Sequence, residues 1–293
     1  MQYLLYLVLY PILWIISILP FRLLYFFSDF VYVLVYYILG YRKKTVRANL
    51  AKALPHLNDK ERFVIEKKFY HHMCDMFLEM IKTMTISQKE MEKRFQFTNL
   101  DVYLDLEKKG KSIAIMIAHY ATYEWVISMN YKINFKGYAI YKRLANPHFD
   151  KLVKDIRSKF KAYLITTKET IPTMLENDTS NTLSVYGFAS DQTPRRAESN
   201  HWYTFMGIET PIHFGAESLA KKHDMNIIYL KVKKVKRGYY EATFEVLSED
   251  VHSVPNFKIS ETFMQKVEQQ ILEAPEFYLW THKRWKHKNV PRI

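Results

Sequence analysis

The chain has 293 residues, with 43 Lys or Arg against 30 Asp or Glu, a formal net charge of +13. This length allows one large domain or two small ones, and the charge favours an anionic lipid, an acidic carrier protein or nucleic acid as partner. With only seven glycines, no Gly-x-Gly-x-x-Gly or P-loop motif occurs, which excludes those nucleotide-binding loops. A single cysteine, Cys74, excludes an intrachain disulfide and a four-cysteine zinc site.

The N-terminus contains two apolar stretches. Residues Tyr3–Leu19 carry no charge, and Leu23–Leu39 is interrupted only by Ser28 and Asp29. As a helix the first stretch would rise about 25 Å, which is marginal for a bilayer core of roughly 30 Å. We expect it to anchor the chain while the second stretch lies at the interface, which keeps Asp29 out of hydrocarbon. A membrane hairpin and a pair of soluble core helices are the alternatives, and the lack of a basic start disfavours a signal peptide.

Basic and aromatic residues support a membrane location. The cluster Arg42–Arg47 follows the apolar stretches, and such clusters mark the cytoplasmic side of a membrane. The 22 Tyr and 19 Phe residues suit a membrane interface, where a ring meets the lipid headgroups. We therefore predict a membrane anchor over residues 1–41 and a second domain over 42–293, whose first part, 42–98, is helical.

The rest of the chain alternates between helical and strand patterns. A short helix over 45–54 stops at Pro55, and Asn58 can cap a long helix that runs to about Met84. Beyond these, we expect helices at 100–109, 123–131, 147–160, 170–176, 215–223 and 260–273, and strands at 113–118, 138–142, 162–166, 183–189, 226–235 and 239–247. This order predicts an α/β fold with a mostly parallel central sheet covered by helices on both faces.

The most informative segment is the apolar strand Ile113–Ala118, which ends in His119, with Glu124 five positions later. With Thr122 as helix N-cap, Glu124 falls in the first helical turn, where the helix dipole favours an anion. A carboxylate bonded to one imidazole nitrogen fixes the tautomer and leaves the other nitrogen to accept a proton. The pair therefore indicates a general base at the carboxyl end of a strand, where open α/β folds place their sites. A structural histidine is the alternative, and the spacing does not indicate a metal site.

Five segments in order carry a family resemblance: His119-x4-Glu124, Tyr141-Lys-Arg143-x-x-Asn146-Pro147-x-x-Asp150, Asp191-Gln192, Phe205-Met-Gly207 and Pro275-Glu-x-Tyr-Leu-Trp280-x-His-x-Arg284-Trp285. Together they resemble the lipid A biosynthesis lauroyl/myristoyl acyltransferases, bacterial inner-membrane members of the lysophospholipid acyltransferase superfamily. The resemblance runs from about residue 40 to 290. The C-terminal segment is its most specific part.

The resemblance implies roles for individual residues. His119 would be the general base, and Glu124 would orient it or help to bind the acceptor. Arg157 and Asp191 match family residues that serve the site, which completes a catalytic set of four. The residues implied in substrate binding are Arg143, Asn146, Gln192 and Arg284, while Lys283, Lys286 and Lys288 could meet phosphates.

The implied reaction is transfer of a fatty acyl chain from a thioester, on acyl carrier protein or CoA, to a hydroxyl of a lipid A precursor, without metal or cofactor. The expected location is the bacterial inner membrane, with the catalytic domain facing the cytoplasm. The chain has Ala121-Thr122 where many members carry Gly-Asn, so a lysophospholipid, aminolipid or other glycolipid acceptor stays open. A lipid-binding module without catalysis is a further alternative, and no motif indicates nucleic-acid binding.

Overall fold

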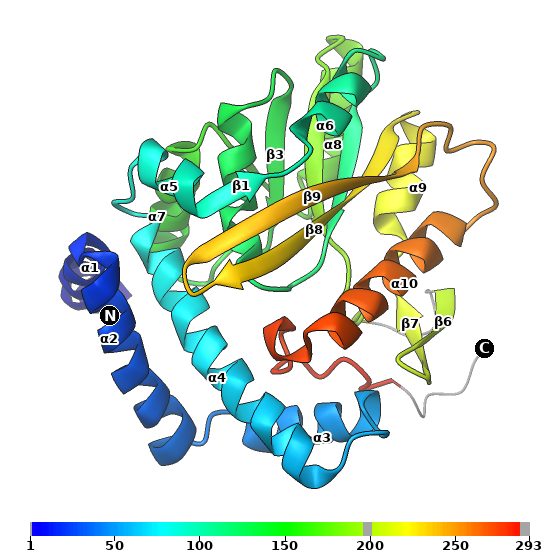
Figure 1. Ribbon diagram of the computed structural model, residues 1–293. Helices are drawn as coiled ribbons and strands as arrows, with labels where there is room; N and C mark the ends of the chain where they lie inside the picture. The colour runs from blue at the N-terminus through cyan, green and yellow to red at the C-terminus, as the bar shows by residue number, and fades with distance from the viewer. Residues whose placement is uncertain (1, 196–200, 288–293) are drawn as a thin grey trace.

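The computed structural model describes residues 2–195 and 201–287 and is built on a seven-stranded sheet (Figure 1). The strands follow the order β1-β9-β8-β2-β5-β3-β4. Their bounds are β1 Phe95–Phe97, β2 Ile113–Ile117, β3 Lys136–Tyr141, β4 Tyr163–Thr166, β5 Ser184–Ala189, β8 Asn226–Lys236 and β9 Tyr239–Ser248. All neighbouring strands are parallel except β8 and β9, which form an antiparallel pair. The predicted α/β class and mostly parallel sheet are confirmed.

Helices flank this sheet and extend from it on the N-terminal side. They are α1 Gln2–Ile18, α2 Phe21–Tyr32 with the π-helical continuation η1 Val33–Ile38, α3 Lys43–Ala53, α4 Asp59–Lys82, α5 Gln88–Arg94, α6 Leu100–Glu107, the 3₁₀-helix η2 Tyr123–Tyr131, α7 Pro147–Ser158, α8 Thr170–Thr179, α9 Gly215–Lys222, α10 Lys258–Glu273 and the 3₁₀-turn η3 Pro275–Phe277. Two further strands, β6 His201–Phe205 and β7 Ile208–Ile212, form a separate antiparallel hairpin.

Alternating side chains along β9 show that both faces of the sheet are covered. Tyr240 packs edge-on against Trp125 of η2, and Phe244 packs against Tyr103 of α6. On the other face, Glu245 accepts a 2.5 Å hydrogen bond from Lys266 of α10. The two faces therefore carry separate helical layers, as expected for a mostly parallel sheet.

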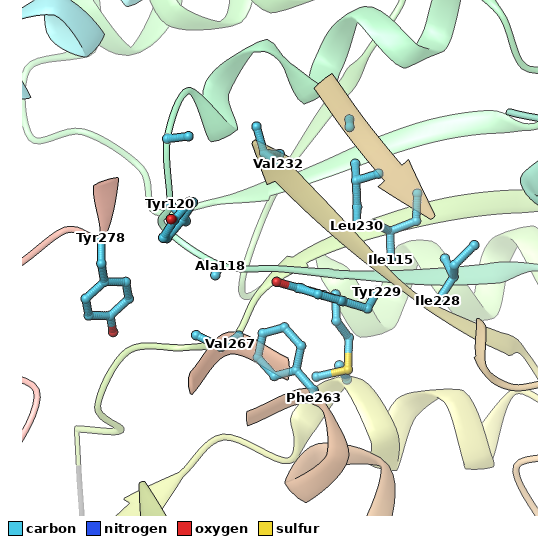
Figure 2. Packing of buried hydrophobic residues seen from close by; sticks show 14 of the residues in the cluster. Ile115, Ala118, Tyr120, Ile228, Tyr229, Leu230, Val232, Phe263, Val267 and Tyr278 are labelled. Atoms are coloured by element: carbon cyan, nitrogen blue, oxygen red, sulfur yellow. The ribbon is translucent and has the colours of Figure 1, made fainter. Parts of the chain in front are cut away.

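The core on the α10 face is continuous with the end of strand β2. The ring of Tyr229 packs edge-on against Phe263 of α10, as Figure 2 shows, with Val267 close by. Ala118 and Tyr120, which directly follow β2, are buried at one end of the same cluster. The loop after β2 thus begins with residues that are packed into the core.

The long helix α4 connects the N-terminal helices to the sheet, and Figure 1 shows α2 running beside it. The side chain of Asn58 accepts hydrogen bonds from the backbone of Lys60 and Glu61, and Glu61 bonds back to the amide of Asn58. This capping box confirms the predicted start of the helix at Asn58.

Three features differ from the expectation. Strand β1 lies inside the part, 42–98, that was expected to be helical, because a three-residue strand leaves no measurable periodicity. The β6–β7 hairpin lies in a segment without a predicted element. The hairpin turn is made by Met206 and Gly207, both with positive φ. The predicted helix over 123–131 is present as a 3₁₀-helix, and Thr122 stands at its N-cap position but makes no capping hydrogen bond.

Candidate active site

The site forms where two neighbouring parallel strands end. β2 pairs with β5 in a register that sets Ile117 opposite Ala189. His119 and Asp191 each follow by two residues, so both emerge at the same edge of the sheet. The Nδ1 of His119 lies 2.7 Å from Oδ1 of Asp191, and the same oxygen accepts the backbone N–H of His119 at 3.1 Å. One carboxylate therefore fixes both the ring and the backbone of the histidine.

The electrostatics of this pair follow from burial and charge. Asp191 is completely buried, and only 18 % of the His119 side chain is exposed. Burial alone would lower the pKa of His119, but the charge and hydrogen bond of Asp191, with a contribution from Glu124, outweigh it and raise the pKa. Burial opposes ionisation of Asp191 as well, yet the charge and hydrogen bonds of His119 lower the pKa of that carboxyl. Both shifts favour an ionised Asp191 carboxylate that is hydrogen-bonded to the His119 ring.

Glu124, the expected partner of His119, does not bond to the imidazole in the structure. The carboxylate on the imidazole belongs to Asp191, while Glu124 accepts a 2.6 Å hydrogen bond from Nη2 of Arg157. The 3₁₀ form of η2 places Tyr123 beside the histidine, with its ring edge-on to the imidazole at 4.9 Å between centroids. Glu124, one residue further, meets the last turn of α7, which carries Arg157.

A cavity of about 290 Å³ opens beside His119. Its polar lining includes His119, Glu124 and Arg157. The remaining wall is mostly apolar and comes from β2, η2, β3 and β5, with lining residues such as Ile115, Ile117, Val126, Ile127, Met129, Ile140, Val185, Gly187 and Ala189. A charged rim joined to an apolar recess suits a ligand with a reactive head and a hydrocarbon tail.

The C-terminal segment holds the backbone of the histidine loop. The N–H of Leu279 donates to the carbonyl of His119 at 3.1 Å, and the N–H of Ala121 donates to the carbonyl of Phe277 at 2.9 Å. Ala121 has a positive φ of 50°, a conformation that this pairing stabilises.

The same C-terminal segment is fixed to two other parts of the molecule. The side chain of Asn49 on α3 donates to the carbonyls of Trp280 and His282, at 2.8 and 2.7 Å. The ring of His282 accepts the N–H of Thr193, two residues after Asp191. The C-terminal segment therefore makes hydrogen bonds to both loops that form the site, the one after β2 and the one after β5.

The substrate-binding residues expected from the resemblance do not gather at the cavity. Arg143 is exposed in the loop before α7. Asn146 caps α7 by accepting the N–H of His148, and Gln192 is half-buried after Asp191. Arg284 is buried and donates to Thr210 Oγ1 at 3.1 Å and to the carbonyl of Pro211 at 3.3 Å, so it joins the C-terminal segment to β7. Lys288 lies outside the described residues.

The residues of the cavity wall were not predicted from the sequence, although one signal for them exists. On β5 the residues Val185, Gly187 and Ala189 alternate with residues of the opposite face, and all three line the cavity. Small residues at alternate positions of a buried strand leave space beside the sheet. Without the position of η2 across from them, this pattern does not distinguish a cavity from close packing.

Comparison with known proteins shows the family of the chain but no individual relative. The chain matches no curated protein. The family model described as bacterial lipid A biosynthesis acyltransferase matches residues 1–287, nearly the full length. The chain therefore belongs to the bacterial lipid A biosynthesis acyltransferase family.

Proposed function

We propose that this acyltransferase moves a fatty acyl chain from a thioester to a hydroxyl of a lipid A precursor, with His119 as the general base. The observation that carries the proposal is the 2.7 Å contact between His119 Nδ1 and Asp191 at the rim of the cavity. Asp191 occupies Nδ1, and no described residue bonds to Nε2. Nε2 is therefore the nitrogen available to the acceptor hydroxyl.

The proton follows a short path. With Nδ1–H donated to Asp191, neutral His119 presents the lone pair of Nε2. Nε2 takes the hydroxyl proton as the acceptor oxygen attacks the thioester carbonyl, and Asp191 stabilises the imidazolium that forms. The carbon–sulfur bond then breaks, and the proton on Nε2 passes to the leaving thiolate. The products are an ester and a free thiol, and no covalent enzyme intermediate is required.

Glu124 and Arg157 act as a unit in this mechanism. Their ion pair lines the cavity with His119, and the bond from Nη2 to Glu124 leaves other guanidinium N–H groups of Arg157 for a substrate. A positive group at this position stabilises negative charge on the carbonyl oxygen during attack. Glu124 orients the guanidinium and adds to the field that raises the pKa of His119.

The apolar recess receives the acyl chain, so its thioester lies near His119. The donor is acyl carrier protein or CoA, both anionic, which agrees with the net charge of +13. The acceptor is a membrane lipid, and the N-terminus has one helical stretch, Phe21–Ile38, that is long and apolar enough to cross a membrane by length and composition. We place the enzyme on the bacterial inner membrane with its catalytic domain facing the cytoplasm.

The test compares two histidine–carboxylate pairs. His201 and Glu261 lie 2.9 Å apart with both side chains 25 % exposed, and neither lines the cavity. We expect His119→Ala to lower acyl transfer by about 10²- to 10⁴-fold, whereas His201→Ala keeps activity near that of the wild type. Near-normal transfer by a folded His119→Ala variant would exclude the histidine as base.

The same assay identifies the acyl donor and the acceptor lipid. Purified enzyme in mixed micelles is given acyl carrier protein or CoA thioesters of one chain length, with a lipid A precursor, a lysophospholipid or an aminolipid as acceptor. We expect transfer to the lipid A precursor. Transfer to only one of the other acceptors would overturn the proposed substrate but leave the role of His119 intact.

A further inference from the structure

The first N-terminal helix is attached to the rest of the protein at both ends. At its start, the side chain of Asn146 donates to the carbonyl of Gln2 at 3.2 Å. At its end, Nζ of Lys82 donates to the carbonyls of Ser17 and Leu19, at 2.6 and 2.8 Å. The partners belong to α7 and α4, so the full length of α1 lies along the surface of the folded domain.

Side chains reinforce the attachment at the start of α1. The ring centroid of Tyr3 lies 5.0 Å from that of His148, and the ring of Tyr6 packs edge-on against Phe149 at 5.4 Å. A helix of this length rises about 25 Å, close to the thickness of the hydrocarbon core. If α1 crossed a bilayer, the start of α7 and the end of α4 would have to lie near opposite membrane surfaces. The domain between them would then sit in hydrocarbon.

The second helix is attached along its length by polar contacts to α4. These are Tyr25 to Glu79 at 2.8 Å, Ser28 to Asp75 at 2.7 Å, and Tyr36 to Glu66 at 2.9 Å. In the middle of the helix, Asp29 accepts a 2.6 Å hydrogen bond from Arg237 at the turn between β8 and β9. In a spanning helix this ion pair and the polar side of α4 would lie at the level of the hydrocarbon, where charged groups are costly.

The outward sides of both helices are apolar. Exposed residues on α2 and η1 recur at helical spacing and form one stripe, consisting of Leu23, Phe26, Phe30, Val33, Leu34 and Tyr37. On α1 the exposed surface is wider, includes Leu4, Val8, Ile12 and Ile15, and the helix contains no charged residue. The polar, attached side and the apolar, exposed side of α2 and η1 are typical of a helix that lies in the plane of a membrane surface.

The residues around these apolar sides identify the partner as lipid. Exposed Arg22 stands at the junction of the two helices, and Arg42, Lys44 and Arg47 follow them. Trp14 and Tyr41 are exposed beside the apolar residues, and such rings favour the headgroup region. A basic and aromatic rim around an apolar surface matches one leaflet of an anionic bilayer.

We propose that α1 and α2 both lie in one leaflet, so that the described part of the chain enters the membrane from one side and does not cross it. This inference rests on the membrane association in the proposed function and replaces the expectation that the first stretch anchors the chain across the bilayer. It also brings the membrane close to the site, because α1 contacts the start of α7 and the same helix carries Arg157 at the cavity. A lipid acceptor would thus reach His119 from the leaflet in which the enzyme lies.

Single cysteines placed at three positions distinguish the possible topologies. In a Cys74→Ser background, Gln2→Cys marks the start of α1, Arg22→Cys the junction of the helices, and Lys44→Cys the segment after them; all three positions are exposed. A fourth variant, Lys151→Cys, marks the side of the catalytic domain through α7. Each variant is labelled with a membrane-impermeant maleimide in spheroplasts and in inverted membrane vesicles, after its acyl transfer activity has been checked.

We expect all three positions to be labelled from the same side as residue 151 and to be protected from the other side. Labelling of residue 2 from the opposite side would show that α1 crosses the membrane, and labelling of residue 22 from that side would show a hairpin; either result overturns the inference. Loss of the wild-type protein from the membrane fraction would overturn it together with the proposed membrane association. An unchanged sidedness with no acyl transfer in any assay would overturn the proposed function alone.

Discussion

Glu124 and Arg157 form a 2.6 Å ion pair at the rim of the cavity, with side chains only 16 and 17 % exposed. Both residues were expected near His119 from the sequence, but their contact with each other was not. Because the pair is largely withdrawn from water, loss of either partner leaves the other charge poorly compensated. The two residues should therefore depend on each other in any measurement.

A double-mutant cycle tests this dependence. We expect Glu124→Gln and Arg157→Gln each to lower kcat/KM by at least about tenfold, since each change disrupts the same charged unit beside the reacting carbonyl. The double variant should lose much less activity than the product of the two single effects. As a control on the same helix, the exposed pair Lys151–Asp155, also 2.6 Å apart, should give single variants with nearly normal rates. Independent effects of Glu124 and Arg157 would contradict a shared role.

Asp191 should set the pH dependence of the reaction. Its charge raises the pKa of His119, and the base must be neutral to accept a proton, so wild-type kcat/KM should rise with pH through a midpoint above 6.5. Asp191→Asn removes the charge that favours imidazolium. The midpoint of the pH–rate profile should therefore move to lower pH, while the plateau rate falls by about 10²- to 10⁴-fold because the tautomer is no longer held.

A second histidine–aspartate pair provides the control for this measurement. Asp178 contacts the ring of His223 at a position that does not line the cavity. Asp178→Asn should leave both the midpoint and the plateau unchanged. A midpoint for Asp191→Asn that stays in place or moves to higher pH, in a variant whose thermal unfolding is close to that of the wild type, would contradict the assigned cause of the raised pKa.

The convergence of His119 and Asp191 was accessible from the sequence because each follows a buried apolar strand. In a parallel sheet, strand ends of the same polarity meet at one edge. The sequence does not show that β2 and β5 are neighbours in the sheet, since β3 and β4 lie between them in the chain. Chain order alone allows several strand orders.

The partner of Glu124 could not be predicted for a different reason. It depends on the 3₁₀ form of the helix that begins at Tyr123 and on where α7 ends beside it, and both are set by packing between distant segments. The contacts of Arg284 are similar, because they depend on the β6–β7 hairpin, for which no element was predicted. Local patterns thus located His119 at the end of its strand but did not predict the ion pair of Glu124 and Arg157.

The depth of the cavity should limit the acyl chain. Gly187 lines it, and a Cβ placed there would meet only the carbonyl oxygen of Tyr138 at 3.7 Å, an ordinary contact. We expect Gly187→Ala to fold and to shift donor preference towards shorter chains, by about fourfold in relative kcat/KM for each methylene that is excluded, since burial of one methylene contributes about 0.8 kcal/mol. Competition between thioesters of different lengths measures this.

The matched control is Gly215→Ala at the start of α9, where an added Cβ meets nothing within 4 Å and which does not line the cavity. It should leave the chain-length profile unchanged. If Gly187→Ala lowers transfer equally for all chain lengths, the recess does not hold the acyl chain.

Glu79 should make the stability of the fold depend on pH. This carboxyl group is completely buried on α4 and accepts hydrogen bonds from Tyr25 and Tyr240, both at 2.8 Å. Burial raises its pKa from 4.5 to about 7, partly offset by the charge of Lys234. Because the folded pKa is the higher one, its stabilising effect is complete below pH 4.5 and is lost as pH rises to about 7.

Glu79→Gln removes this titration while keeping the shape and the hydrogen-bonding capacity of the side chain. Relative to the variant, the wild type should therefore lose up to about 3 kcal/mol of stability between pH 4.5 and 8, most of it below pH 7. Thermal unfolding of both proteins in one detergent across this range measures the difference. Parallel pH curves for the two proteins would contradict the raised pKa. The expected result is that the two curves lie close together at pH 4.5 and that the wild type falls below Glu79→Gln by pH 8, because the neutral amide carries no penalty for burying a charge.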